Sequence, residues 1–324
     1  MISEEVTTLN RVISVKTDRS LSKRLTNVLR RWQLLILILP AIVWYVVFCY
    51  GPMYGVIISF KNFSPRKGIL ASAWANNHGF EHFIRFFNSY YFWTILKNTV
   101  VISLYNLALG FPLPILLALC LNEIKNGLFK NVVQTATYAP YFISTVVMCG
   151  MLVSFLSPTT GIVNIILKKF GVEPIAFLSK PAMFPTIYVV SNVWQSTGWG
   201  SIIYLATLSG VDEQLHEAAI IDGASRFQRM IHISLPYIVP TMVILLILNS
   251  GSILSVGYEK IYLLQNTLNE DTSEVISTYV YKAGLVNAQY SFSTAVGLFN
   301  SVINLFVLVI VNTVAKKTSE NSLW

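Results

Sequence analysis

Six long apolar stretches, separated by polar segments, dominate the sequence. They run Leu34–Phe60, Asn98–Leu121, Val132–Leu156, Phe184–Ser209, Tyr237–Val256 and Phe292–Ala315, and none contains Asp, Glu, Lys, Arg or His. Each stretch is long enough to cross a bilayer, which takes about 20 residues in a helix. Because the backbone finds no water in lipid, such spans are helical. The pattern therefore predicts an all-α membrane protein with about six transmembrane helices.

The ends of the chain set the expected orientation of these helices. Segment 1–33 is polar and carries seven basic residues: Arg11, Lys16, Arg19, Lys23, Arg24, Arg30 and Arg31. Basic segments next to membrane spans stay on the cytoplasmic side. We therefore expect segment 1–33 in the cytoplasm, a membrane domain over 34–315 and a cytoplasmic tail over 316–324. The first apolar stretch lies too far from Met1, and is too long, for a cleavable signal.

Composition excludes several classes of protein. Of the 324 residues, 54% are hydrophobic and only 12% are charged, whereas a soluble domain carries about 25% charged residues. These values exclude a soluble globular protein, a disordered chain and a nucleic-acid-binding module. We assign the net charge of +8 to anchors on the cytoplasmic side of the membrane instead. The three cysteines lie inside apolar stretches, a pattern of neither a disulfide framework nor a metal site.

One loop on the expected cytoplasmic side, Gly210–Pro236, predicts two short helices with a break between them. Asp212 favours a helix start, and Gly223 favours the left-handed conformation that ends a helix. Ser225 can cap the second helix, and Pro236 is expected to stop it. An apolar face of the first helix, at helical spacing, comprises Leu215, Ala218, Ala219 and Ile220 or Ile221. The loop is either an amphipathic hairpin at the membrane surface or a knob that inserts into a groove on a cytoplasmic partner.

The order of residues in this loop resembles a known signature. The pattern is Glu217-Ala218-Ala219, three residues, Gly223, nine residues, Ile233, one residue and Leu235-Pro236. It matches the signature loop of binding-protein-dependent ABC importer permeases without a departure. The resemblance implies that the loop couples the membrane helices to an ATPase. The coupling residues that it implies are Glu217, Ala218, Ala219, Ile220, Asp222, Gly223, Arg226, Ile233, Leu235 and Pro236.

Other stretches resemble the sugar-permease branch of this family. They are Pro52–Gly55, Ser59–Lys61, Asn98-Thr99, Tyr138–Ser144, Trp194-Gln195, Gly198–Ser201 and Ile221–Arg226. They are most like the subgroup that imports oligosaccharides derived from polysaccharides, including alginate and pectin fragments. The resemblance covers the chain from Arg31 onward. It implies the architecture of a type I ABC importer permease in a prokaryotic inner membrane, with an oligosaccharide substrate that includes acidic, polyuronide-derived ones.

The same resemblance implies a set of partners. An extracytoplasmic binding protein delivers the substrate, a second permease chain, either a different protein or a second copy, completes the pathway, and two ATPase subunits drive alternating access. The sequence contains no Gly-x-x-x-x-Gly-Lys-Ser/Thr loop that would cradle ATP phosphates. We therefore expect a transport subunit that is not an enzyme and holds no cofactor, with ATP and Mg²⁺ bound by the partner subunits.

Polar residues inside the spans are candidates for the substrate pathway, because polar groups that face lipid are costly. They are Asn192, Trp194 and Gln195 in the fourth span, Asn249 in the fifth, and Asn300 and Asn304 in the sixth. Amides hydrogen-bond sugar hydroxyls, and an aromatic ring covers the apolar face of a sugar. The alternative is that these residues bridge packed helices. Because the spans contain no cation, we expect substrate carboxylates to be compensated by a partner, by water or by helix dipoles.

The expected outer loops are not bare connectors. The loop Lys61–Lys97 is rich in aromatic residues, which form either an interfacial belt or a docking surface for an outside partner. The stretch Gly161–Gly171 predicts a short amphipathic helix that ends at Gly171.

Two other classes of protein stay open. An ion-coupled secondary transporter usually carries a carboxylate or a histidine inside the membrane, and the six spans have none. A membrane-embedded enzyme needs a catalytic cluster or a metal site. For such a cluster or metal site in an enzyme, the outer loops offer only the pair Glu270-Asp271, and His78 with His82. Co-purification of a separate ATPase would distinguish the permease from both classes.

Overall fold

The computed structural model describes residues 32–125, 127–318 and 322–323. The seven basic residues that predict the orientation of the chain lie outside these ranges. The chain falls into two compact units that divide between Ile57 and Ile58.

The described part of the first unit, residues 32–57, is a single helical run. It comprises α3 (Trp32–Trp44), the wider π-helix η2 (Tyr45–Tyr50) and α4 (Gly51–Met53), and the 3-10 helix η3 (Tyr54–Phe60) leads out of it. No residue of η2 or α4 is buried in the described chain. Apolar side chains that stay exposed along a helix of this length are expected where it faces lipid.

The second unit begins with a small hairpin that the sequence did not predict. Its elements are β1 (Lys61–Asn62), α5 (Gly68–Ala71) and β2 (Ala73–Trp74), followed by η4 (Asn77–Gly79) and α6 (Glu81–Phe87). The strands pair antiparallel, with Lys61 opposite Trp74. The Nζ of Lys61 donates to the carbonyl oxygens of Ile69 and Leu70 at 3.0 and 2.9 Å. The described residues form no other strand, so the all-α prediction is confirmed apart from this two-residue ladder.

Long helices occupy the remaining predicted spans. They are α7 (Phe92–Gly110) with α8 (Pro112–Glu123), α9 (Leu128–Tyr138) with α10 (Thr145–Phe155), α12 (Phe184–Leu208), α15 (Leu235–Ser250) and α19 (Tyr290–Thr318). In the described ranges four helices are long and apolar enough to cross a membrane, and a fifth is added if α9 and α10 form one broken span. α12 is as long but carries more polar residues. The count of six spans and the side on which each end lies stay predictions.

The third predicted span, Val132–Leu156, is not one continuous helix. α9 passes through the 3-10 turn η5 (Ala139–Phe142) and the chain then bends by 99° into α10. Pro140 lies in the turn and has no N–H to continue the helical ladder. Ser144 starts α10 afresh, because its side chain accepts a hydrogen bond from the Val147 N–H. A proline and a serine cap therefore interrupt a run that is predominantly apolar.

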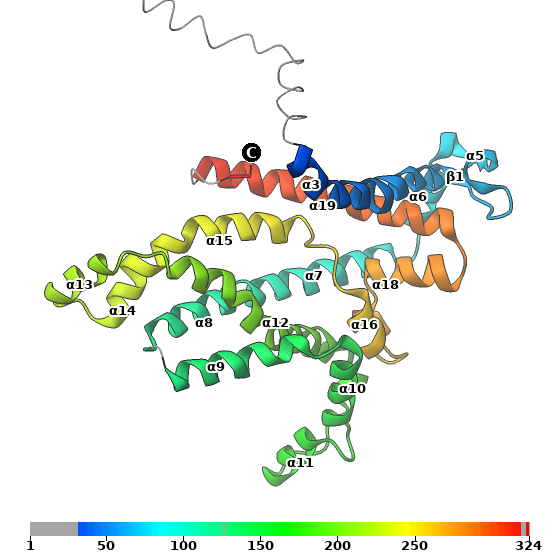
Figure 1. Cartoon of the computed structure of the whole chain (residues 1–324). Helices are drawn as coiled ribbons and strands as arrows, with labels where there is room; N and C mark the ends of the chain where they lie inside the picture. The colour runs from blue at the N-terminus through cyan, green and yellow to red at the C-terminus, as the bar shows by residue number, and fades with distance from the viewer. Residues whose placement is uncertain (1–31, 126, 319–321, 324) are drawn as a thin grey trace, which may run out of the picture. The chain divides into compact units, whose positions relative to one another are not determined.

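Short helices join the long ones. They are α11 (Ile162–Lys169), η6 (Phe177–Ser179), η7 (Pro181–Met183), α13 (Glu213–Ile221), α14 (Arg226–Arg229), η8 (Met230–Ser234), α16 (Tyr258–Leu264), α17 (Glu270–Ser273), α18 (Ile276–Tyr281) and η9 (Lys282–Val286). The helix predicted over Gly161–Gly171 is confirmed as α11. α13 and α14 lie at one end of the second unit, as does the C-terminal end of α19, and α16 and α18 lie toward the other (Figure 1).

α12 is the central helix of the second unit and packs against α7, α8 and α9. Tyr188 and Val193 join an apolar cluster with Ile102 of α7. Tyr204 and Leu208 join a second cluster, with α8 and α15. Clusters at both ends fix α12 to its neighbours, so the polar residues between them are held in defined positions.

A glycine allows the close approach of α9 to α12. A Cβ atom built on Gly198 would lie 1.9 Å from the carbonyl oxygen of Thr137. Any side chain at this position would therefore push the two helices apart.

Candidate functional site

The loop Gly210–Pro236 forms the two short helices and the break that its sequence predicts. The Asp212 side chain accepts a hydrogen bond from the Gln214 N–H at 3.0 Å and starts α13. Gly223 adopts φ +81°, and the next N–H returns to the carbonyl oxygen of Ala219 at 2.8 Å. Ser225 and Gln228 form a reciprocal capping box that starts α14. The predicted roles of Asp212, Gly223 and Ser225 are confirmed.

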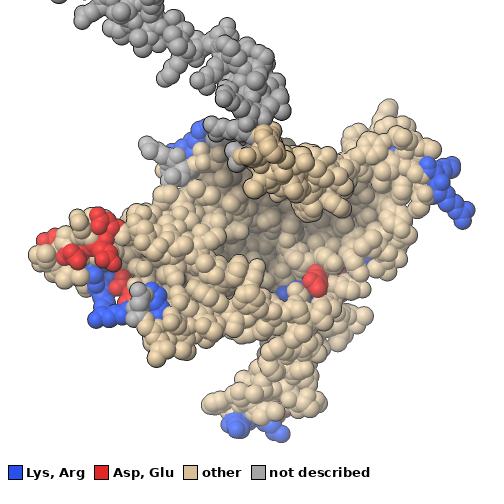
Figure 2. All heavy atoms as spheres, in the orientation of Figure 1, with Lys and Arg blue, Asp and Glu red and all other residues tan. Residues whose placement is uncertain are grey.

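This loop presents unburied apolar side chains to its surroundings. No residue of α13 or α14 is buried, and Ile221 is 86% exposed. Other exposed apolar side chains in the loop are those of Leu215, Ile220 and Phe227. Acidic side chains gather over α13 and basic ones beside α14 at this end of the molecule (Figure 2). An exposed apolar face with a charged margin has the composition of a surface that another chain covers.

The base of the loop is anchored in the helix bundle. Leu235 and Met230 pack against the cluster that contains Tyr204, Leu208 and Ile238. The Tyr237 hydroxyl donates to the carbonyl oxygen of Gly210 at 2.9 Å and ties the two ends of the loop together. The base of the loop is therefore fixed to the bundle that contains α12 and α15.

The prediction that Pro236 stops the second helix is wrong. Pro236 lies in the first turn of α15, and the helical run continues from Arg226 to Ser250. The preceding π-helix η8 explains this result, since the Leu235 N–H donates to the carbonyl oxygen of Met230, five residues back. A wider turn shifts the hydrogen-bond register just where the proline lacks a donor. Ile233 is half-buried within η8.

A polar pocket of about 370 Å³ lies between α7, α12 and the end of α15. Asn192 and Asn249, two of the predicted pathway residues, line it together with Asn106. The Nδ2 of Asn192 donates to the Oδ1 of Asn106 at 2.8 Å, so this amide bridges α12 and α7 while it faces the pocket. Serine hydroxyls complete the polar lining, from Ser103, Ser196, Ser252 and Ser255. The molecule is hollowed between α15 and α12 in this region (Figure 2).

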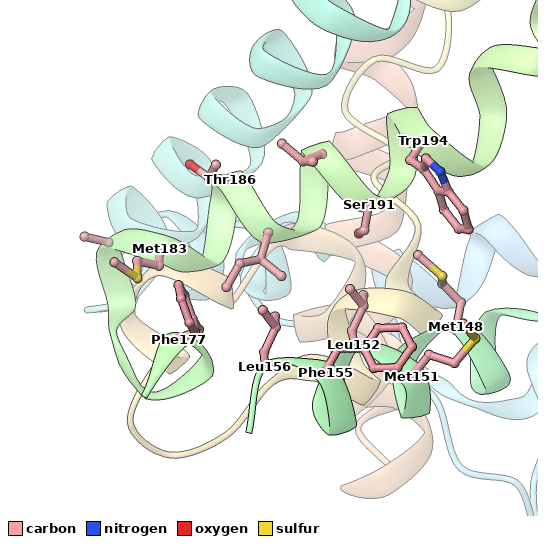
Figure 3. A pocket seen from close by; sticks show the side chains of 13 residues that line it. Met148, Met151, Leu152, Phe155, Leu156, Phe177, Met183, Thr186, Ser191 and Trp194 are labelled. Atoms are coloured by element: carbon pink, nitrogen blue, oxygen red, sulfur yellow. The ribbon is translucent and has the colours of Figure 1, made fainter. Parts of the chain in front are cut away.

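Trp194 does not join Asn192 in the polar pocket. It lines an apolar cavity of about 740 Å³ between α10 and α12. Its ring lies near Met148 and Met151, and Phe177 and Met183 line the far part of the cavity (Figure 3). The predicted cluster Asn192-Trp194-Gln195 is therefore divided between two faces of α12.

Gln195 supports the break in the third span. Its Nε2 donates to the carbonyl oxygen of Ile143 at 2.8 Å, at the 99° bend between η5 and α10. Its Oε1 lies 3.5 Å from the Nζ of Lys260, in α16. Gln195 thus connects α12 with two other elements.

The two predicted pathway residues of α19, Asn300 and Asn304, lie outside the polar pocket. The Oδ1 of Asn304 accepts from the Leu254 N–H at 3.0 Å, and its Nδ2 donates to the Ser255 hydroxyl at 3.0 Å. Asn304 therefore secures the segment that follows α15, as the helix-bridging interpretation expects. The Oδ1 of Asn300 is buried and finds no partner among the described residues.

Lys260 is the polar residue that sequence reasoning missed. It is only 5% exposed, and its burial lowers its pKa to about 8. It was overlooked because it lies beyond the fifth apolar stretch, in a helix that folds back against α10 and α12. By contrast, Lys282 pairs with Glu270 and Glu274 at 2.7 and 2.5 Å. Burial acts to lower the pKa of Lys282, but its hydrogen bonds to these two carboxylates raise it overall.

Comparison with known proteins identifies the family. Residues 110–320 match the family described as "Binding-protein-dependent transport system inner membrane component". The chain is 42% identical over 300 residues to the polygalacturonan/rhamnogalacturonan transport system permease protein YteP of Bacillus subtilis (strain 168), covering 93% of this chain and 92% of YteP. It is 40% identical to Protein LplB of the same organism, covering 91% of each chain.

A solved structure has the same fold. A chain of a bacterial ABC transporter involved in the import of the acidic polysaccharide alginate aligns with a TM-score of 0.83 and 40% identity, covering 92% of this chain and 99% of that one. A chain of a bacterial alginate ABC transporter in complex with an alginate pentasaccharide-bound periplasmic protein aligns with the same TM-score and identity. The family match and these likenesses decide for a permease over a secondary transporter or a membrane-embedded enzyme. With its signature loop and its bundle of long apolar helices, this chain belongs to the binding-protein-dependent ABC importer permeases, the multi-pass inner-membrane subunits of these transporters.

Proposed function

We propose that this chain is one of two membrane-spanning subunits of an ATP-driven importer of acidic oligosaccharides derived from polyuronides. An extracytoplasmic binding protein delivers the substrate, and a second, different permease chain completes the pathway. Two ATPase subunits bind ATP and Mg²⁺. Likeness to permeases for polygalacturonan/rhamnogalacturonan and for alginate, at 42% and 40% identity over more than nine-tenths of this chain, supports the substrate class.

The exposed face of α13 is the observation that carries the mechanical part of the proposal. Ile221 and Leu215 are exposed, while the small side chains of Ala218 and Ala219 permit close approach of a partner. α13 enters a groove on an ATPase subunit, and Glu217 and Asp222 lie at the margin of that contact. When the ATPase subunits close, the anchored base of the loop moves α12 and α15, which line the polar pocket. The pocket then changes its access from one side of the membrane to the other.

Asn192 and Asn249 are proposed as the hydroxyl-binding residues of this chain, because their amides face the polar pocket. Trp194 is not part of that contact, since it lines the apolar cavity.

The test is uptake by the complete complex in proteoliposomes. The permease pair, the ATPase subunits and the binding protein are reconstituted with ATP supplied to the ATPase side. Galacturonate or alginate oligosaccharides are compared with their carboxyl-reduced, neutral counterparts. ATP-dependent uptake of the acidic oligosaccharides is expected. Uptake of only the neutral counterparts would refute the substrate class, and uptake without ATP would refute the family mechanism.

A further inference from the structure

A lysine without a counter-charge lies beside the proposed pathway. Lys260 is 5% exposed, in the first turn of α16. Its Nζ lies 3.5 Å from the Oε1 of Gln195 and 5.9 Å from the ring centroid of Tyr188. In the described parts of the chain, no carboxylate pairs with it. An ammonium has three donors, and in the described parts of the chain this one makes one hydrogen bond, at 3.5 Å.

Two other lysines, Lys61 and Lys282, show how unusual this arrangement is. Lys61 is also buried, at 7% exposure, but it donates to two backbone carbonyl oxygens at 3.0 and 2.9 Å. Lys282 is held between two carboxylates. A buried charge that lacks such partners costs several kcal/mol. The protein therefore keeps a destabilising cation at Lys260, which is expected where an anion binds.

A polar stripe of α12 connects Lys260 with the polar pocket. Tyr188, Asn192 and Ser196 recur at intervals of four residues, which places them on one face of the helix, and all three line the pocket. Gln195 lies next to this stripe, three residues from Asn192. Gly257, the residue before α16, also lines the pocket. The ammonium is therefore within one or two side chains of the pocket.

We propose that Lys260 is a specificity-determining residue that binds a carboxylate of the oligosaccharide, with the amide of Gln195 holding its place in the empty protein. This inference rests on the proposed function. The half-buried Gln195 accepts only a weak, long hydrogen bond from the ammonium. A carboxylate oxygen makes a shorter, charge-assisted bond and displaces the amide oxygen. The apolar stretches contain no cation, and the structure places one beside them from α16.

Charged and titratable groups around Lys260 are few. They are Cys149 from α10, Tyr188 from α12 and Glu259 from α16 itself. Glu259 is exposed and makes no ion pair with Lys260.

The experiment compares substrates that differ only in charge. Uptake of trigalacturonate and of its fully methyl-esterified form is measured in proteoliposomes that contain the complete complex. The variants are Lys260→Met, which removes the charge at similar length, and Lys260→Arg, which keeps it. Lys180→Met is the matched control, because Lys180 is an exposed outer-loop lysine. Size-exclusion chromatography and basal ATP hydrolysis report assembly.

Lys260→Met is expected to lower the initial rate with trigalacturonate at low concentration by about tenfold, the effect of losing one charge-assisted hydrogen bond. The esterified substrate, Lys260→Arg and Lys180→Met should stay near wild type. Equal loss for both substrates, or no loss for either, would overturn the proposal. If the wild-type complex takes up only the esterified form, the proposed function fails instead.

A pH series on the wild-type protein tests the charge of Lys260 without a variant. It therefore does not depend on whether Lys260→Met assembles. The ratio of trigalacturonate uptake to esterified uptake should fall as pH rises through about 8, where the ammonium loses its proton. In Lys260→Arg this ratio should stay constant, because the guanidinium keeps its charge. A ratio that does not change with pH in the wild-type protein, or that falls equally in Lys260→Arg, would contradict the role of Lys260.

Discussion

Replacing Gly223 with alanine tests the mechanical role of the coupling loop. Gly223 has φ +81°, and a Cβ built on it meets nothing within 4 Å. The cost of the substitution is therefore conformational strain alone, about 1–2 kcal/mol for an L-residue in the left-handed region. That strain acts at the break between α13 and α14, at the end of the molecule opposite to α16 and α18.

The assay is ATP hydrolysis by the reconstituted complex, stimulated by substrate-loaded binding protein. Strain of this size lowers the fraction of correctly shaped loops by about five- to thirtyfold at most, and stimulated hydrolysis and transport should fall together by up to that factor. Docking of the binding protein should stay unchanged. Gly150→Ala is the matched control, because its Cβ also meets nothing within 4 Å and its φ is not positive. Gly223→Asn should retain most activity, since asparagine tolerates the left-handed region. Wild-type coupling in Gly223→Ala would refute the argument.

Three further changes test the architecture. Gly198→Ala places a Cβ against the backbone of Thr137, so the complex should lose about 1–3 kcal/mol of stability or fail to assemble. Thermal unfolding measures this loss, and an unchanged melting temperature would show that α9 does not approach α12 so closely. Gln195→Leu leaves the Ile143 carbonyl oxygen without its donor and should lower the stability of the bend by about 1–3 kcal/mol. Proteolysis near the bend should then be faster than in the wild-type protein; an equal rate would show that Gln195 does not stabilise the bend. Ser225→Ala removes the cap of α14 and should weaken stimulated hydrolysis while costing about 1 kcal/mol; full activity would show that the cap is dispensable.

Local chemistry was predictable from the sequence. Asp212, Gly223 and Ser225 act through backbone groups within a few residues of themselves, so their types and spacing were enough. The apolar stretches likewise located the long helices. Trp194 and Asn192 are two residues apart, about 200° around a helix, and their separation onto different faces could have been read from that spacing.

Features that depend on tertiary contacts were not predictable. Pro140 and Ser144 mark the place of the bend at Ile143 in the sequence, but the bend is completed by Gln195, 52 residues later. Pro236 continues a helix only because the preceding π-helix shifts the hydrogen-bond register. Lys260 lies beside Cys149 and Gln195 because α16 folds back against α10 and α12. Each of these features needs a partner that is distant in sequence or a backbone geometry without a clear sequence signal.

The contact between α13 and an ATPase subunit is the central claim, and site-specific photocrosslinking tests it most directly. A photoreactive residue replaces Ile221, which is 86% exposed at the tip of the loop. The same residue in place of Tyr90, which is 90% exposed between α6 and α7, serves as the control. The account predicts a crosslink from position 221 to the ATPase subunit, altered by nucleotide, and none from position 90. Absence of that crosslink in an assembled, active complex, or an equal crosslink from position 90, would contradict it.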